Sequence, residues 1–125
     1  MQSDFDDQIT EIVAARRFAE QTIGVDHARL ADILVIVSEL ASNAVRHAHS
    51  KFSVRVCNQR GVVRIEVTDH GDGWPEVPRR EEVVSGGGMG LNLVAALSDR
   101  WGATERPGGK VVWAELDDGP ALRVV

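Results

Sequence analysis

The segment between His27 and Ser50 constrains the fold most, because it contains no glycine or proline over about twenty residues. Its run Ile33–Val37 is rich in β-branched residues, which favour strands. Strands are usually far shorter than this segment, however. We therefore predict one helix from about His27 to about Ala48. Its apolar residues share one face of that helix: Ile33, Val37, Leu40, Ala44 and Ala48.

A second helix is predicted before this one, from about Asp6 to about Thr22. Ser3 together with Asp6 resembles a capping box at its start. Gly24 is the expected C-terminal cap, and Asp26 is the expected N-cap of the following helix. The apolar residues that recur at helical spacing are Ile9, Ile12 and Val13.

The rest of the chain predicts strands and one more helix. Lys51–Cys57 and Val62–Thr68 alternate apolar and polar residues, and the turn residues between them predict a hairpin. A helix is expected over about Leu91–Trp101 and a last strand over Lys110–Leu116, followed by the tail 117–125. This order predicts an α/β fold, a two-layer sandwich in which helices cover one face of a mainly antiparallel, mixed sheet.

Length and charge limit the classes of function. At 125 residues the chain is expected to be a single domain, 1–125. The net charge of −5 argues against direct nucleic-acid binding, which needs a basic face. Cys57 is the single cysteine, which fits a reducing compartment. The polar N-terminus is unlike a signal peptide, and no apolar run would span a bilayer. We therefore expect a cytoplasmic protein that does not bind a membrane.

Glu39 and Asn43 are polar residues within the predicted core helix. They are four positions apart, so they are neighbours on its surface, at the border of the apolar stripe. A carboxylate and a carboxamide at such a border can share a cation or hold a water against a phosphate. A solvated glutamate and a locally hydrogen-bonded asparagine are the alternative for this motif alone.

A second motif, DHGDG, directly follows a predicted strand. Gly71 and Gly73 permit backbone conformations with positive φ. Asp69, at the end of the strand, is placed to accept a hydrogen bond from an exocyclic amine such as that of adenine. A plain acidic turn is the alternative.

The third motif is the glycine-rich run Gly86–Gly90 before a predicted helix. Amides at a helix N-terminus bind anions, and four glycines let the backbone approach a polyphosphate. A flexible loop is the alternative. A Rossmann site is excluded because Asp69 precedes the glycines instead of following them. A Walker site is excluded because no lysine follows the run.

Together the motifs would supply groups for adenine, for phosphates and for Mg²⁺. In this order they resemble the N, G1 and G2 boxes of the GHKL ATPase superfamily, which has the Bergerat fold: Glu39-x-x-x-Asn43, Asp69-x-Gly71-x-Gly73 and Gly86-x-Gly88-x-Gly90. The stretches SELASNAVRHA, VTDHGDGWP, GGGMGLNLVAALSDRWG and GGKVVWAEL are similar to small anti-sigma-factor serine kinases of the SpoIIAB/RsbW type, especially actinobacterial ones. The resemblance covers roughly 9–116.

The resemblance implies a role for each matching residue. Glu39 would orient or deprotonate the attacking hydroxyl, and Asn43 would hold Mg²⁺. Asp69 would bind the adenine amino group. Arg46 lies near Asn43 by helical spacing and would either offset phosphate charge or form a solvated salt bridge.

The glycines of the resemblance imply the rest of an ATP site. The wall under the base would be shaped by Gly71 and Gly73. The phosphates would be wrapped by a second set of glycines and neighbouring amides: Gly86, Gly88, Gly90, Met89 and Leu91. The polar segment 75–88 is predicted to be a lid that orders over bound nucleotide.

The resemblance implies a Mg-ATP-dependent serine/threonine kinase that phosphorylates an anti-sigma-factor antagonist and sequesters a sigma factor. The alternative is a catalytically inactive nucleotide-binding protein that acts only by partner binding. A sensor histidine kinase fragment is disfavoured, because nothing upstream resembles a phospho-accepting helical hairpin.

The chain departs from the family pattern in two places, one residue and one segment. Val111 is placed where relatives carry a threonine near adenine, which predicts weaker ATP binding by about 1 kcal/mol. The segment before the first helix is short where relatives have a strand that helps them dimerise. A homodimer is therefore left open.

Overall fold

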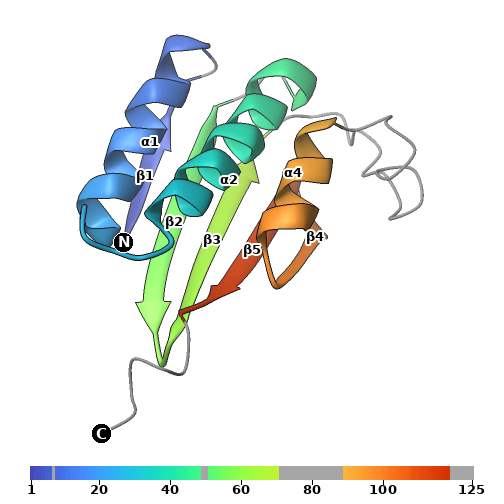
Figure 1. Ribbon diagram of the computed structural model, residues 1–125. Coiled ribbons are helices and arrows are strands. Elements are labelled where there is room, and N and C mark those ends of the chain that lie inside the picture. Colours follow the sequence, from blue (N-terminus) through green and yellow to red (C-terminus); the bar gives the residue numbers. More distant parts are fainter. Residues whose placement is uncertain (7, 49–50, 71–88, 119–125) are drawn as a thin grey trace, which may run out of the picture.

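The computed structural model describes residues 1–6, 8–48, 51–70 and 89–118. They form two layers, with the helices on one face of a sheet (Figure 1). The elements are β1 (Gln2–Phe5), α1 (Thr10–Ile23), α2 (Leu30–Asn43), the π-helix η1 (Ala44–Ala48), β2 (Phe52–Gln59), β3 (Val62–Asp69), α4 (Met89–Leu97), β4 (Arg100–Arg106) and β5 (Gly109–Asp117).

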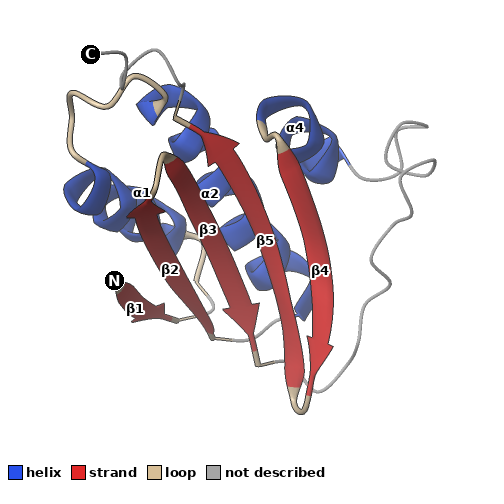
Figure 2. Ribbon diagram, turned by 90° about the horizontal axis from the view of Figure 1, so that it is seen from below, coloured by secondary structure: helices blue, strands red, loops and turns tan. Residues whose placement is uncertain are grey.

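The sheet has five strands in the order β1-β2-β3-β5-β4, and every pairing between them is antiparallel. Figure 2 shows the sheet with the helices behind it. The predicted α/β sandwich with a mainly antiparallel sheet is therefore confirmed. Among the described residues, no helix has the length and apolar character to cross a membrane.

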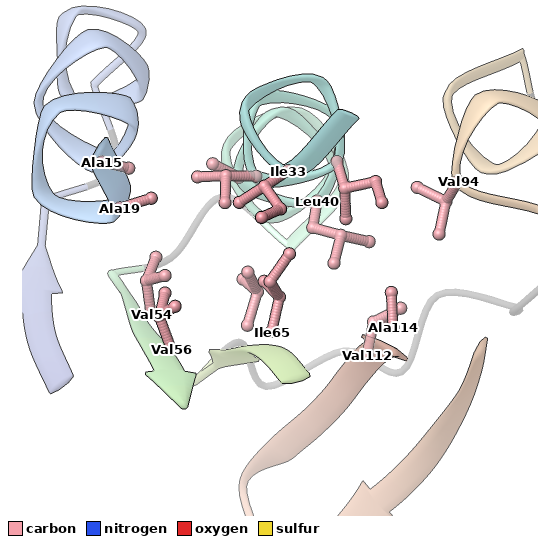
Figure 3. Close-up of a cluster of buried hydrophobic side chains, with 14 of the residues drawn as sticks. Ala15, Ala19, Ile33, Leu40, Val54, Val56, Ile65, Val94, Val112 and Ala114 are labelled. Carbon is pink, nitrogen blue, oxygen red and sulfur yellow. The ribbon is translucent and has the colours of Figure 1, made fainter. Parts of the chain in front are cut away.

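The core lies between the two layers (Figure 3). It forms because α2 turns its apolar face to the sheet while alternate residues of the strands point to the helices. The predicted face of α2 is confirmed where side chains are described, since Ile33, Val37, Leu40 and Ala44 are all buried. Figure 3 labels Ala15 and Ala19 of α1, Ile33 and Leu40 of α2, Val94 of α4, and Val54, Val56, Ile65, Val112 and Ala114 of the sheet.

The sequence pattern does not predict the two edge strands, β1 and β4. Ser3 lies in β1 and pairs with Val54, so the predicted capping box is wrong. Helix α4 ends at Leu97, not at Trp101, and Trp101 belongs to β4. Each of these strands pairs with a neighbour along one edge only. Most of their residues are exposed or half-buried, so their sequences lack the alternation of apolar and polar residues that predicts a strand.

The predicted start of the core helix also needs correction. Helix α2 begins at Leu30, and Asp26 is not its N-cap. Instead, the Nδ1 atom of His27 accepts a 3.0 Å hydrogen bond from the backbone N–H of Arg29. The N-cap residue is Arg29, and no side chain caps this end of α2. The prediction for Gly24 is confirmed, because it caps α1 with a φ of 101° and its N–H donates to the Glu20 carbonyl.

Candidate functional site

Three segments that are distant in sequence meet at one end of the molecule. The C-terminal end of α2 with η1, the end of β3 and the start of α4 lie together there (Figure 1). Helix α2 packs against α4, and η1 packs against β3. Asn43, Asp69 and Met89 are the terminal residues of these segments. The fold therefore brings the described residues of the three motifs to the same end of the molecule.

Glu39 and Asn43 lie where the helical spacing predicts. Both side chains are half-buried, while their neighbours Ile36 and Leu40 are fully buried in the core. They therefore border the apolar stripe of α2. Their oxygens are the kind of ligand that Mg²⁺ takes from proteins, so the donor chemistry fits this ion. Arg46 is exposed.

A π-helix follows Asn43 directly, which corrects the prediction of a regular helix as far as Ala48. Residues Ala44–Ala48 form η1, whose hydrogen bonds span five residues instead of four. Short π-helical turns inside α-helices occur frequently at functional sites.

Asp69 ends β3 and forms an ion pair that the motifs do not predict. Its Oδ2 atom accepts a 2.5 Å hydrogen bond from the Nζ atom of Lys110. The two side chains are only 4% and 7% exposed. The two residues are also direct partners in the β3–β5 pairing. A group expected to recognise adenine is therefore held by a buried cation.

Val111, expected near adenine, lies one position beyond the partner of Asp69 on β5. Val112 and Ala114 point to the helices in Figure 3, and side chains alternate along a strand. Lys110 therefore lies on the helix side of β5, whereas Val111 lies on the opposite face. There Val111 pairs with Thr68, not with Asp69. The weaker ATP binding by about 1 kcal/mol expected from this valine stays a prediction.

Gly109 allows β5 to approach Asp69 closely. A Cβ atom at this position would lie 2.0 Å from the backbone oxygen of Asp69 and 3.2 Å from its Oδ1 atom. Any side chain would force the two strand ends apart. The glycine thus fixes the position of Asp69 at the end of β3.

The predicted phosphate-binding glycines fall mostly on residues that are not described. Gly71, Gly73, Gly86 and Gly88, and the predicted lid 75–88, lie outside the described residues. The expected helix start is present, because α4 begins at Met89 and continues through Gly90. Leu91 is buried in the core, so only its backbone amide would serve a ligand.

Two hollows lie on the described part of the chain, and Asp69 and Gly109 are among the residues that line the first of them. The first has a volume of about 390 Å³ and is lined by Ser53, Arg55, Thr68 and His70 among others. The second, of about 490 Å³, lies along β1. Neither is lined by Glu39 or Asn43. Within the described residues, no cluster of three or more His, Cys, Asp or Glu side chains would bind a metal.

The fold and this arrangement of residues define a two-layer ATPase-type domain. Helix α2, which carries Glu39 and Asn43, packs on an antiparallel sheet, and strand β3 of that sheet ends at Asp69. The family model of the histidine kinase-like ATPase domain matches residues 5–116, and the chain belongs to this family. Nucleotide use follows from that membership.

Solved structures agree with this assignment of the fold. The RsbU and RsbW domains of a Mycobacterium tuberculosis protein match with a TM-score of 0.65 and 22% identity, over 94% of this chain and 32% of that chain. The histidine kinase domain of a blue-light-activated kinase from Erythrobacter litoralis matches with a TM-score of 0.60 and 20% identity, over 87% and 60%. The catalytic domain of the histidine kinase ThkA matches with 0.61 and 17%, over 94% and 97%. This chain thus spans less than two thirds of the first two proteins. No curated protein matches it.

Proposed function

We propose that the protein binds Mg-ATP and transfers its γ-phosphate to a serine or threonine of an anti-sigma-factor antagonist, and that it sequesters a sigma factor. One structural neighbour contains an RsbW domain, the type of protein that the motifs resemble. A cytoplasmic location belongs to the same proposal. So does a homodimer, since β1 supplies the N-terminal strand that the resemblance implied.

The observation that supports the kinase most directly is the pair Glu39 and Asn43. Both are half-buried, one turn apart, beside the η1 turn and at the same end as Asp69. Phosphoryl transfer needs mainly positioning and charge stabilisation. Asn43 would hold Mg²⁺ through its side-chain oxygen, and the ion would supply positive charge that offsets the charge of the phosphates. Glu39 would hold the attacking hydroxyl and accept its proton, and amides at the start of α4 would donate to phosphate oxygens.

A second candidate function is partner binding without catalysis. The ion pair of Asp69 with Lys110 favours it, because the carboxylate expected to bind adenine already accepts from a cation. In that case the domain would keep the fold of its family and would act only through a protein surface.

The experiment that tests the proposal is transfer of labelled γ-phosphate to a candidate antagonist protein. We expect Glu39→Ala to reduce transfer by about 100-fold or more, because a general base contributes about that much. ATP affinity should stay near that of the wild type. Asn43→Ala should instead weaken ATP binding only in the presence of Mg²⁺, which calorimetry with and without the ion measures.

Glu20→Ala is the matched control, since Glu20 is a half-buried glutamate on α1. It should leave transfer unchanged. Equal transfer by Glu39→Ala and wild type would refute the kinase and favour the partner-binding candidate. If the wild type did not bind ATP, both the proposed kinase activity and the proposed use of ATP would be refuted.

A further inference from the structure

We propose that the sheet carries an anion-binding site on the face opposite the helices, and that the ligand of this site is a phosphate group. The guanidinium groups of Arg55 and Arg106 bind the phosphate oxygens. The inference goes beyond the proposed function and does not depend on it, because Glu39 and Asn43 do not line this site.

The site is the first of the two hollows, with a volume of about 390 Å³. Val54, Val56 and Ile65 point toward the helices in Figure 3. Side chains alternate along a strand, so Arg55 of β2 points to the other face of the sheet. Glu66 of β3 is the pairing partner of Arg55 and points the same way. The hollow that these two residues line therefore lies on the face opposite the helices.

Arg106 reaches the same hollow from β4. Thr104 pairs with Val111, which lies on the face opposite the helices. Arg106 is two residues further along β4, so it lies on that face as well. In the strand order, β3 and β5 lie between β2 and β4. Arg55 and Arg106 therefore approach the hollow from two sides.

The two arginines supply positive charge that the protein does not neutralise. Within the described residues, neither Arg55 nor Arg106 forms an ion pair. Two carboxylates line the same hollow, and each already has a cationic partner. Glu66 accepts from Arg64 at 2.7 Å, and Asp69 is bound by its buried lysine. The hollow therefore has an excess of positive charge, in a protein whose net charge is −5.

A phosphate group fits this charge and these donors. A guanidinium group presents its N–H donors in a planar fork that matches the oxygens of a phosphate or a carboxylate. Two arginines balance the double charge of a phosphate, whereas a carboxylate would balance only one of them. Thr68 lines the same hollow, and its hydroxyl can donate a further hydrogen bond. The hydroxyl of Ser53 already donates to Asp4 at 2.7 Å.

Free phosphate and a phosphorylated serine present the same chemistry, so the test uses both. NMR would follow the isotope-labelled protein without nucleotide, at about pH 8 and constant ionic strength, where a phosphate ester is doubly charged. The titrants are inorganic phosphate, N-acetyl-O-phosphoserine amide and acetate. We expect the amide signals of Arg55, Thr68 and Arg106 to shift until the site is saturated. Acetate should bind at least about 5-fold more weakly, because it balances only one arginine.

The two phosphate compounds distinguish the sources of the ligand. Saturation by the phosphoserine compound would assign the site to a phosphorylated side chain of a protein. Saturation by inorganic phosphate alone would assign it to the free ion. No saturable shift with either compound would overturn the proposal.

Variants of the two arginines test which residues bind the phosphate. Arg55→Met and Arg106→Met should each weaken binding about 5- to 10-fold, because one charged donor is lost. Both side chains are exposed, so neither replacement should disturb the fold. Arg17→Met is the matched control, since Arg17 is an exposed arginine on α1, and it should keep the wild-type affinity.

Two results with these variants would overturn the proposal. Equal affinities of Arg55→Met and Arg17→Met would mean that the phosphate is attracted by charge in general. Shifts confined to the amides at the start of α4, and unchanged in Arg55→Met, would place the phosphate at the candidate nucleotide site. That second result would support the proposed function while refuting a site on the opposite face of the sheet.

Discussion

Gly109 is the residue whose replacement should disturb the candidate site most directly through the backbone. An added Cβ would lie 2.0 Å from the Asp69 oxygen, so β3 and β5 would have to separate at their ends. We expect Gly109→Ala to lower the free energy of unfolding by about 1–3 kcal/mol, as overpacking usually does. Urea unfolding measures this, and the amide chemical shifts of Asp69 and His70 should move.

Gly108→Ala provides the comparison, because Gly108 has a φ of 79° and a Cβ there would meet no atom within 4 Å. It should destabilise by about 1 kcal/mol through backbone strain alone. The amide shifts of Asp69 should stay where they are. If both variants moved those shifts equally, the contact between Gly109 and Asp69 would not hold the site.

The contrast between Glu39 and Lys110 shows what residue patterns predict here. Glu39 and Asn43 were predictable because a helix has one period and both fall at the edge of one apolar stripe. Lys110 was also in phase with Val112 along a strand, so its inward direction was available from the sequence. Its partner was not, because the pairing of β3 with β5 joins residues 41 positions apart.

At the scale of elements, Arg29 connects three parts of the fold. From the start of α2 its guanidinium donates to the Leu97 carbonyl at the end of α4, at 2.9 Å. It also donates to Asp99 Oδ2 at 2.9 Å and to the Asp117 carbonyl of β5 at 3.1 Å. The side chain is 28% exposed, so water competes only partly for these contacts. Arg29 therefore fixes α4 relative to α2 and β5.

Replacing Arg29 with methionine should loosen this junction. We expect Arg29→Met to lower the free energy of unfolding by about 1–3 kcal/mol, because several acceptors lose a charged donor. Thermal unfolding measures the loss, and hydrogen exchange should accelerate in α4 more than in α1. Arg16→Met, at an exposed position of α1, should change stability by less than about 0.5 kcal/mol. Equal midpoints for the two variants would contradict the role of Arg29.

The elements that the sequence did not predict are those with the weakest local signal. Helix α2 and the β2–β3 hairpin have long periodic patterns and turn residues, so they were predictable. Strand β4 has exposed residues at both ends, and β1 buries only Phe5. Such edge strands form because they pair with a neighbouring strand, and their own residue pattern does not predict them. Their positions depend on the tertiary fold.

At the scale of the whole molecule, the face of the sheet opposite the helices is stabilised by charge. Arg64 bonds to Glu66 at 2.7 Å and to Glu115 at 2.8 Å, and its guanidinium lies 4.4 Å from the Trp113 ring centre. Arg100 bonds to the same Glu115 at 2.8 Å. The network thus joins β3, β5 and β4 across the face opposite the described helices. Salt and acid should weaken it, because it is only partly shielded from water.

Acid should therefore destabilise the protein through Glu115 in particular. Hydrogen bonds from Arg100 and Arg64 hold the pKa of Glu115 below its ordinary value of 4.5. A carboxyl with a lowered pKa in the folded state contributes stability above its unfolded pKa. That contribution is lost as the pH falls through the folded pKa. The wild type should therefore have the full contribution at pH 7 and begin to lose it as the pH falls below 4.5.

Glu115→Gln isolates this contribution, because glutamine is uncharged at every pH. We expect the variant to be less stable than the wild type by about 1 kcal/mol at pH 7, the upper range for a partly exposed pair. The difference should shrink as the pH falls below 4.5, and it should vanish once the pH lies below the lowered pKa of Glu115 in the folded protein. Urea unfolding at several pH values measures both curves. Glu105→Gln, at an exposed position of β4, should show little difference from the wild type at any pH. A deficit of Glu115→Gln that stayed constant at every pH at which the protein is folded would mean that Glu115 stabilises the sheet by packing, and not by its charge.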